Sequence, residues 1–295
     1  MVRRPSTGFP WTAPTWPDTI RKAPEKPTLG TGYDTEWARR YPARLARLVV
    51  NEAITRPAMR VIADPQVEGL DRLAHLEGPV IFTANHSSHL DTPLLLSVIP
   101  ERWRNRIVVA GAADYFFDSR LRATAFALAL GAIPIERHRV SRDSATRAAR
   151  LVEEGWSLLI FPEGGRSPDG WGQAHRPGAA WLAERTGRAV IPVHLEGTRK
   201  ILARGATRLK PGTTHITFGR PLLPVGNPRE LAVKVEATIA ALGDERTTDW
   251  WTAKRRAASG TTPSLRGPDT SGWRRTWALG GTPDPSRRPR PWPPR

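Results

Sequence analysis

Residues 80–99 read Val-Ile-Phe-Thr-Ala-Asn-His-Ser-Ser-His-Leu-Asp-Thr-Pro-Leu-Leu-Leu-Ser-Val-Ile. Residues 80–84 are apolar or β-branched and predict a buried strand, and residues 91–99 predict a helix. The polar residues between them predict a loop. A strand that leads through a loop into a helix is the repeating unit of α/β proteins, so this stretch predicts the fold class.

The same alternation continues along the chain. Short β-branched runs at 107–111, 132–135, 157–161, 189–194 and 215–218 predict further strands, and helical patterns near 118–130, 141–154, 174–187 and 228–242 lie between them. We therefore expect an α/β fold in which helices flank a mostly parallel mixed sheet. In such folds the reactive groups lie on loops at the strand ends.

Residues 33–75, ahead of the first of these strands, predict an N-terminal amphipathic helical segment. The apolar residues Trp37, Tyr41, Leu45, Leu48 and Val49 recur at short helical steps, with four arginines between them. Pro42 suits the start of a helix. A basic amphipathic helix lies on an anionic membrane surface or packs its apolar stripe on the domain, and periodicity leaves both interpretations open.

The net charge of +17 is concentrated at the two ends of the chain. Residues 1–32 and 254–295 hold 15 of the 45 basic residues, 4 of the 28 acidic residues and 14 of the 29 prolines. Because proline at this density prevents helices and paired strands, we expect two disordered tails around a domain of residues 33–253. The tryptophans in these tails suit a membrane interface or nucleic-acid bases, whereas a solvated basic tail needs no ligand.

Composition excludes several classes of protein. The chain has no cysteine, which removes disulfides, thiolate nucleophiles and thiolate metal sites. Its longest uncharged stretches have 13 residues, too few for a transmembrane helix, and its start lacks the apolar region of a secretory signal. We therefore expect a cytoplasmic protein. The phosphate-loop, dinucleotide-binding and serine-hydrolase glycine patterns do not occur.

The loop after the first quoted strand carries the candidate catalytic groups. His86 and Asp91 are five residues apart, so the carboxylate is within reach of one ring nitrogen and leaves the other as a base toward a hydroxyl. His89 joins them as a third residue of a type that binds Zn or Fe, but no further cluster completes a metal site. We expect no metal ion.

Four blocks of sequence occur in order at the ends of predicted strands. They are Asn85-His-Ser-Ser-His-Leu-Asp91, Gly131-Ala-Ile-Pro-Ile-Glu-Arg137, Phe161-Pro-Glu-Gly-Gly-Arg-Ser167 and Val190-Ile-Pro-Val193. Together they resemble the motifs of the glycerolipid acyltransferase family typified by bacterial 1-acyl-sn-glycerol-3-phosphate acyltransferase. The resemblance covers residues 80 to 220 and departs from the family at Gly165, where a threonine is usual.

The resemblance implies an acyltransferase-like fold and an enzyme of phospholipid biosynthesis. His86, oriented by Asp91, would remove the proton from the hydroxyl of lysophosphatidate as it attacks the thioester of acyl-CoA or acyl carrier protein, without a cofactor. Another lysolipid or polar lipid is the alternative acceptor, since one fold serves related acceptors. A non-catalytic basic protein that binds membrane or nucleic acid is the alternative from a different class, and its function would survive loss of His86.

The resemblance also implies a substrate site. It gives binding roles to Ser88, Gly131, Arg137, Glu163, Gly164, Arg166 and Pro192. The two arginines suit a phosphate, although a surface salt bridge is the commoner fate of an arginine. Glu163 either organises the acceptor or is a turn carboxylate. The uncharged residues 123–130 either line an acyl groove or pack in the core.

Charge and resemblance together imply the partners and the location. The expected partners are acyl-CoA or acyl carrier protein, a lysophospholipid acceptor and an anionic membrane surface, with no specific nucleic acid. We expect a peripheral protein on the cytoplasmic face of the plasma membrane.

Overall fold

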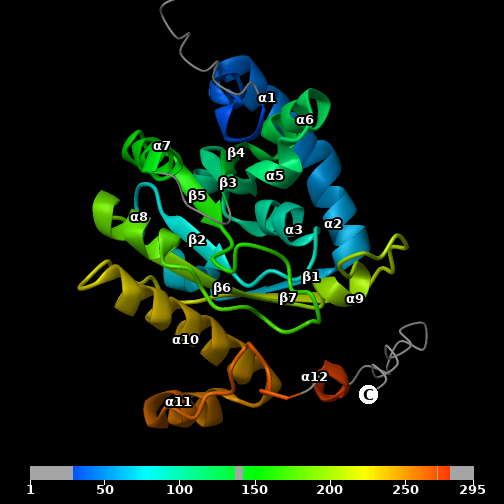
Figure 1. Cartoon of the computed structure of the whole chain (residues 1–295), viewed down its shortest axis with the longest axis vertical. Coiled ribbons are helices and arrows are strands. Elements are labelled where there is room, and N and C mark those ends of the chain that lie inside the picture. The colour runs from blue at the N-terminus through cyan, green and yellow to red at the C-terminus, as the bar shows by residue number, and fades with distance from the viewer. Residues whose placement is uncertain (1–28, 137–141, 271, 280–295) are drawn as a thin grey trace, which may run out of the picture.

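A seven-stranded sheet forms the centre of the protein, seen here in a computed structural model that describes residues 29–136, 142–270 and 272–279 (Figure 1). The strands are β1 Pro65–Glu68, β2 Ile81–Ala84, β3 Ile107–Ala112, β4 Ala132–Ile135, β5 Ser157–Ile160, β6 Val190–Glu196 and β7 Thr214–Phe218. Their order across the sheet is β1-β7-β6-β2-β5-β3-β4, and all neighbours are parallel except β6 and β7. The predicted α/β fold with a mostly parallel mixed sheet is confirmed.

Helices cover both faces of this sheet. The α-helices are α1 Tyr41–Val50, α2 Arg56–Ala63, α3 Asp91–Val98, α4 Glu101–Arg104, α5 Ala113–Phe116, α6 Arg120–Leu130, α7 Arg142–Glu153, α8 Gly178–Thr186, α9 Thr198–Ile201, α10 Pro228–Thr247, α11 Trp250–Ser259 and α12 Gly272–Ala278. Successive residues of β2 point into different cores: Phe82 packs with α2, α3 and α4, and Ile81 packs with α7, α8 and α10. The central strands are buried on both faces, as their continuous apolar runs predict.

The N-terminal segment differs from the prediction at its end. Residues 33–75 were expected to be helical, but α2 ends at Ala63. The next residue, Asp64, has a left-handed backbone with φ 34°, and the chain then continues as the edge strand β1. Pro65 explains the change, because a proline disfavours the helical conformation of the residue before it. Helix α1 begins with Tyr41 and Pro42, as the proline predicts.

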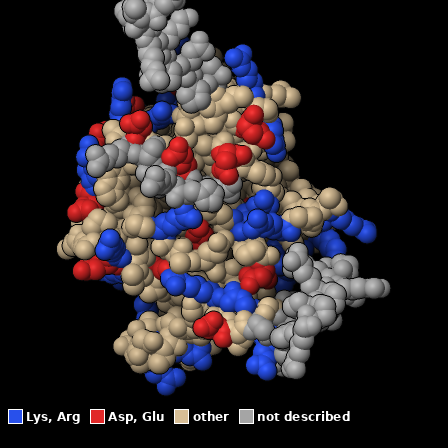
Figure 2. Space-filling model, in the orientation of Figure 1, with Lys and Arg blue, Asp and Glu red and all other residues tan. Residues whose placement is uncertain are grey.

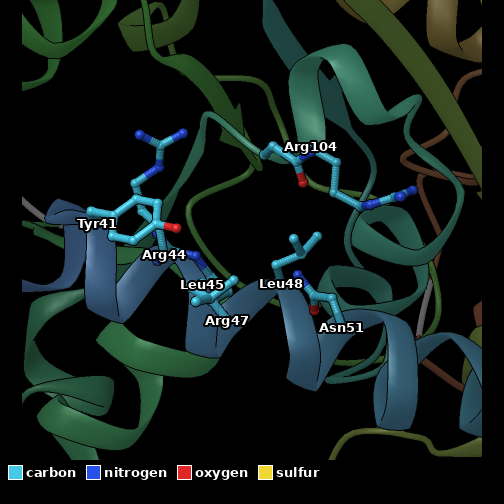
Figure 3. A pocket seen from close by; sticks show the side chains of 8 residues that line it. Tyr41, Arg44, Leu45, Arg47, Leu48, Asn51 and Arg104 are labelled. Carbon is cyan, nitrogen blue, oxygen red and sulfur yellow. The ribbon is translucent and has the colours of Figure 1, made fainter.

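Arg47, which Figure 3 shows among the residues that line a small cavity, joins α1 to the end of α6. Its guanidinium is buried and donates hydrogen bonds to the carbonyl oxygens of Ala127 and Ala38, at 3.3 and 3.0 Å. Burial lowers the pKa of Arg47 to about 10. Ala127 lies in the last turn of α6, where the helix dipole presents its negative end and stabilises a cation. A small cavity of about 130 Å³ opens beside Arg47 between α1 and α4.

The C-terminal segment also differs from the prediction. The expected disordered tail 254–295 contains the end of α11 and the whole of α12. Helix α11 is fixed by its N-cap Asp249, which accepts a hydrogen bond from the Thr252 backbone, and by the ion pair of Arg256 with buried Asp244 at 2.6 Å. Within the predicted tails, residues 1–28, 271 and 280–295 lie outside the described residues.

Candidate active site

The loop between β2 and α3 brings His86 to Asp91. His86 Nδ1 lies 2.8 Å from Asp91 Oδ2, and the same oxygen accepts the backbone N–H groups of Ser87 and Ser88 at 2.7 and 2.9 Å. The carboxylate is fully buried at the N-terminus of α3, where the helix dipole stabilises negative charge. Nδ1 therefore carries the ring proton and donates a hydrogen bond to Asp91, which leaves Nε2 as the basic nitrogen. The predicted contact between the two residues is confirmed.

The backbone and ring of His86 are held by the segment that follows β5. The imidazole stacks on Phe161 with ring centres 4.0 Å apart. The His86 backbone N–H donates to Glu163 Oε1 at 2.9 Å, and its carbonyl accepts the backbone N–H of Ser167 at 2.8 Å. Three independent contacts thus fix the position of the histidine before any substrate binds.

Glu163 lies behind His86 and joins two loops. It is 3% exposed, and its second oxygen, Oε2, accepts the backbone N–H of Gln173 at 2.9 Å. Burial raises the pKa of Glu163 to about 7, although its two backbone hydrogen bonds favour the charged form. Glu163 is not among the residues that line the cavity described below. The geometry therefore places it as a bridge between the two loops of the site.

Gln173 is a residue of the site that sequence reasoning missed. Its side-chain amide donates to the carbonyl oxygens of Gly165 and Arg166, at 3.2 and 3.3 Å, and so shapes the turn that carries Arg166. Gln173 follows the third motif block by six positions and belongs to no block. Its spacing and residue type gave no signal, because the hydrogen bonds depend on how the chain turns after Ser167.

A cavity of about 620 Å³ opens in front of His86. Its polar wall includes His86, His89, Arg122, Arg166 and Arg176, and its apolar wall includes Phe116, Ala125, Phe126, Ala129, Leu130 and Ile135. Helix α6 supplies much of the apolar wall, while its Ala123 and Ala127 are buried in the protein. One face of residues 123–130 thus lines the cavity and another packs in the core.

Cations and aromatic rings gather at the polar wall. The guanidinium groups of Arg122 and Arg166 lie 5.2 and 5.8 Å from the centre of the Tyr115 ring. The Tyr115 hydroxyl lies 3.1 Å from His89 Nε2. Burial, and then the charge of Arg166, lower the pKa of His89 to about 4, so this histidine is neutral at physiological pH. Lys and Arg side chains also gather near the middle of the face that Figure 2 shows, where Figure 1 places α3.

His89 bears on the metal alternative. Its Nε2 contacts Tyr115 while His86 is engaged by Asp91, so the three residues do not converge on one point. In the part of the chain that the structure describes, no three His, Asp or Glu residues form a group that could hold a metal ion.

Three residues predicted to bind substrate lie elsewhere. Ser88 is buried, donates its hydroxyl to the Leu202 carbonyl at 2.7 Å and accepts the Leu90 backbone N–H, so it shapes the loop. Pro192 is buried within β6. Neither residue lines the cavity, and their substrate-binding role stays a prediction. Gly164 and Arg166 do line it, and Arg137 lies outside the described residues.

Gly131 is the third predicted binding residue that does not line the cavity, and its surroundings explain why it is glycine. It ends α6 in the left-handed conformation with φ 67°. A side-chain carbon there would lie 2.8 Å from Arg47 Nη1 and 3.0 Å from the carbonyl oxygen of Ile107. Gly131 therefore serves the junction between α6 and the buried arginine of α1, and not the cavity.

Comparison with known proteins shows similarity to acyltransferases. Residues 64–196 match the family model described as Acyltransferase. The chain is 30% identical over 164 residues to the chloroplastic 1-acyl-sn-glycerol-3-phosphate acyltransferase of Arabidopsis thaliana, which covers 53% of this chain and 43% of that protein. It is 28% identical over 207 residues to a 1-acyl-sn-glycerol-3-phosphate acyltransferase of Chlamydomonas reinhardtii, covering 67% of this chain and 58% of that one.

A solved structure shares the fold. The crystal structure of the 1-acyl-sn-glycerophosphate acyltransferase from Thermotoga maritima aligns with a TM-score of 0.56 and 24% sequence identity, covering 73% of this chain and 84% of that chain. The chain spans about half the length of the curated relatives named above. The matched residues contain His86, Asp91 and all four motif blocks, but not α10, α11 or α12.

Proposed function

Since residues 64–196 match the acyltransferase family model, we propose that the protein transfers an acyl chain from an acyl thioester to the free hydroxyl of lysophosphatidate. The hydrogen bond of buried Asp91 to His86, at the polar wall of the 620 Å³ cavity, is the observation that carries this proposal. Acyl-CoA or acyl carrier protein is the donor, since the phosphates of the one and the acidic surface of the other favour a basic partner. The reaction needs no cofactor.

The chemistry follows from the tautomer of His86. Nε2 removes the proton of the acceptor hydroxyl as the hydroxyl oxygen attacks the thioester carbonyl, and Asp91 stabilises the resulting imidazolium. The carbon–oxygen ester bond forms and the carbon–sulfur bond breaks. The imidazolium then returns its proton to the leaving thiolate, so that the histidine ends the cycle neutral.

The two walls of the cavity suit the two ends of a phospholipid. Arg166, Arg122 and Arg176 offer permanent charges and planar donors to the acceptor's phosphate, and we keep Arg137 as a further candidate from its motif. The apolar wall, with Phe126 of α6, suits an acyl chain, since burial of each methylene group contributes about 0.8 kcal/mol.

The N-terminal helices suit a membrane surface. Their large apolar side chains face solvent: Tyr41 is 74% exposed, Leu45 46% and Val49 56%, while Arg47 of the same helix is buried. This inverts the usual arrangement of an amphipathic helix on a water-soluble domain. We propose that α1 lies on an anionic membrane, on the cytoplasmic face of the plasma membrane, next to the helix α6 that lines the cavity. Among the described residues, no helix has both the length and the apolar character needed to cross a bilayer.

The test is transfer of radiolabelled acyl chains from acyl-CoA to lysophosphatidate on anionic vesicles. We expect phosphatidate from the wild type and a loss of roughly 10³-fold or more in His86→Ala, because the general base is removed. His75→Ala is the matched control, since His75 is exposed and lies outside the motif blocks. Circular dichroism establishes that both variants are folded. Equal turnover in the wild type and a folded His86→Ala would contradict the mechanism.

Gly165 favours a second candidate acceptor. It lines the cavity without a side chain at the position where the family usually has threonine, so the acceptor meets no hydroxyl there. A wild type that is inactive with lysophosphatidate but active with another lysophospholipid, or with acyl carrier protein as donor, would retain the chemistry and change the substrate. A protein inactive with every donor and acceptor, but bound to vesicles in a strongly salt-dependent way, would favour the non-catalytic alternative.

A further inference from the structure

The C-terminal residues 260–270 and 272–279, here called the strap, lie against the outer side of the 161–176 loop. The Gly172 backbone N–H donates to the Leu265 carbonyl at 2.8 Å, and the indole N–H of Trp171 donates to the Arg275 carbonyl at 2.9 Å. Gly267 packs directly on the Trp171 ring, since a side-chain carbon at that position would lie 2.2 Å from it. The strap therefore fits the loop in both hydrogen bonds and shape.

An ion pair adds to these contacts. Arg275 Nε lies 2.8 Å from Asp169 Oδ2, and Nη1 of the same guanidinium donates to the Pro268 carbonyl at 2.9 Å. Partial burial raises the pKa of Asp169, but its hydrogen bonds to Arg275 and to the Trp171 backbone, together with the charge of Arg275, outweigh that effect and lower the pKa. Arg275 thus joins the two segments of the strap to each other and to the loop.

Helix α10 anchors the strap and the loop to the rest of the protein. Glu236 of α10 forms a two-pronged ion pair with Arg266 of the strap, with nitrogen to oxygen distances of 2.8 and 2.9 Å. The same carboxylate accepts the backbone N–H of His175, at the end of the loop, at 3.1 Å. One side chain on a helix therefore holds both segments.

The inner side of the loop holds the catalytic histidine. Gln173, next to the strap-bound Gly172, donates its backbone N–H to Glu163, and Glu163 accepts the backbone N–H of His86. The Gln173 side chain also holds the turn that carries Arg166. A continuous series of hydrogen bonds therefore leads from the strap through the loop to His86.

We infer that the strap is a positioning element for the acyl-transfer site, acting through Asp169, Trp171 and Gly172 on the loop that holds His86 and Arg166. The inference rests on the proposed function for its kinetic consequence. No described residue of the strap lines the cavity, so its effect is on geometry and not on substrate contact. The strap also lies outside residues 64–196, the part of the chain that matches the acyltransferase family.

The kinetic test removes the ion pair in the full-length chain. We expect Arg275→Gln and Asp169→Asn each to lower kcat roughly tenfold, because a shift of about 1 Å in a catalytic group can cost up to 10²-fold. KM for acyl-CoA should change less than about twofold, since the apolar wall is untouched. The double variant should be no slower than either single variant, because both remove one interaction. Arg275→Lys keeps the charge and should restore part of the rate.

Lys234→Gln is the matched control, because it removes one positive charge from an exposed position of α10. Equal kcat in Arg275→Gln and Lys234→Gln would overturn the inference. So would losses from Arg275→Gln and Asp169→Asn that multiply in the double variant, which would mean that the two residues act separately.

Amide hydrogen exchange tests the strap without any assay of activity. We expect the amides of Gly172, Gln173 and Ser167 to exchange at least several-fold faster in Arg275→Gln than in the wild type or Lys234→Gln, because the loop opens more often. Unchanged exchange at all three amides would overturn the inferred role of the strap even if the wild type transfers acyl chains. If these amides exchange faster in Arg275→Gln but the wild type transfers no acyl chains, the result would support the inferred role of the strap and contradict the proposed reaction.

Discussion

The 85–91 loop and the 161–176 loop both hold the candidate site, but they are fixed in different ways. In the first, Asp91 accepts hydrogen bonds from residues three to five positions before it. In the second, Arg275 contacts Asp169 across 106 positions of the chain. The contact of His86 with Asp91 lies within one loop and is therefore recorded in a short motif, although Phe161, Glu163 and Ser167 also hold His86. A loop fixed by residues far away in the chain leaves no local pattern in the sequence from which its contacts can be predicted.

The largest expected effect tests the locally fixed loop. Asp91→Asn should lower kcat roughly 10³-fold, because an amide cannot hold the imidazole in the tautomer that leaves Nε2 basic. The measurement is kcat for acyl transfer, with folding followed by circular dichroism. Asp71→Asn, at an exposed position, is the control and should retain full activity. A folded Asp91→Asn within tenfold of the wild type would show that the loop does not need this carboxylate.

The next effect tests the bridge between the two loops. Glu163→Gln should lower kcat roughly 10- to 100-fold, because the amide can accept only one of the two backbone N–H groups and the other then faces an NH₂ group. KM for the acceptor should change less than kcat if Glu163 acts through His86. A rise in acceptor KM with unchanged kcat would instead return Glu163 to the role of a direct substrate contact.

The same substitution changes how stability depends on pH. Because the pKa of Glu163 is raised to about 7 in the folded protein, the folded state binds the proton more tightly than the unfolded state. Stability from this group is therefore present below the usual pKa of a glutamate and is lost as pH rises to about 7. Urea unfolding should show the wild type losing up to about 1.4 kcal/mol per pH unit in this window relative to Glu163→Gln. Parallel pH profiles would contradict the raised pKa.

The smallest expected effect concerns a third segment, the junction between α6 and α1 at Gly131. Gly131→Ala should lower the free energy of unfolding by roughly 1–3 kcal/mol, because alanine is strained at this φ and its side chain meets Arg47. Substrate KM should stay within about twofold, since Gly131 is outside the cavity. Gly212→Ala is the control, because its nearest neighbour would be 3.8 Å away. A selective rise in acceptor KM would restore the substrate-binding role that the motif implied.

The same contrast explains what the sequence could predict of the fold. Continuous apolar runs predicted the central strands, because a strand buried on both faces needs apolar residues throughout. Edge strand β1 escaped notice since its burial alternates and its four residues include Gln66 and Glu68. Helices α11 and α12 were hidden by the proline and charge content of their surroundings. Their order comes from partners such as Asp244 and Asp169, which no local pattern reveals.

The candidate site divides in the same way. His86 and Asp91 were predictable because their chemistry depends on a spacing of five residues, which the sequence states directly. Ser88 belongs to the first motif block and Gly131 to the second, but Ser88 shapes its loop and Gly131 serves packing. A motif does not distinguish residues that serve structure from residues that serve chemistry. Gln173 was missed because its hydrogen bonds exist only after the loop has folded.

The separation of Arg275 from Asp169 has a consequence for how the protein is made. A ribosome adds about 5–20 residues per second, so the 106 positions between them take roughly 5–20 seconds to synthesise. Once residue 196 has been added, every residue of the region that matches the acyltransferase family exists, but the ion pair that completes its second loop does not form until Arg275 follows. A growing chain should therefore acquire its sheet well before its full rate of turnover. Translation that stops before Arg275 would leave a folded domain with a loosely held histidine.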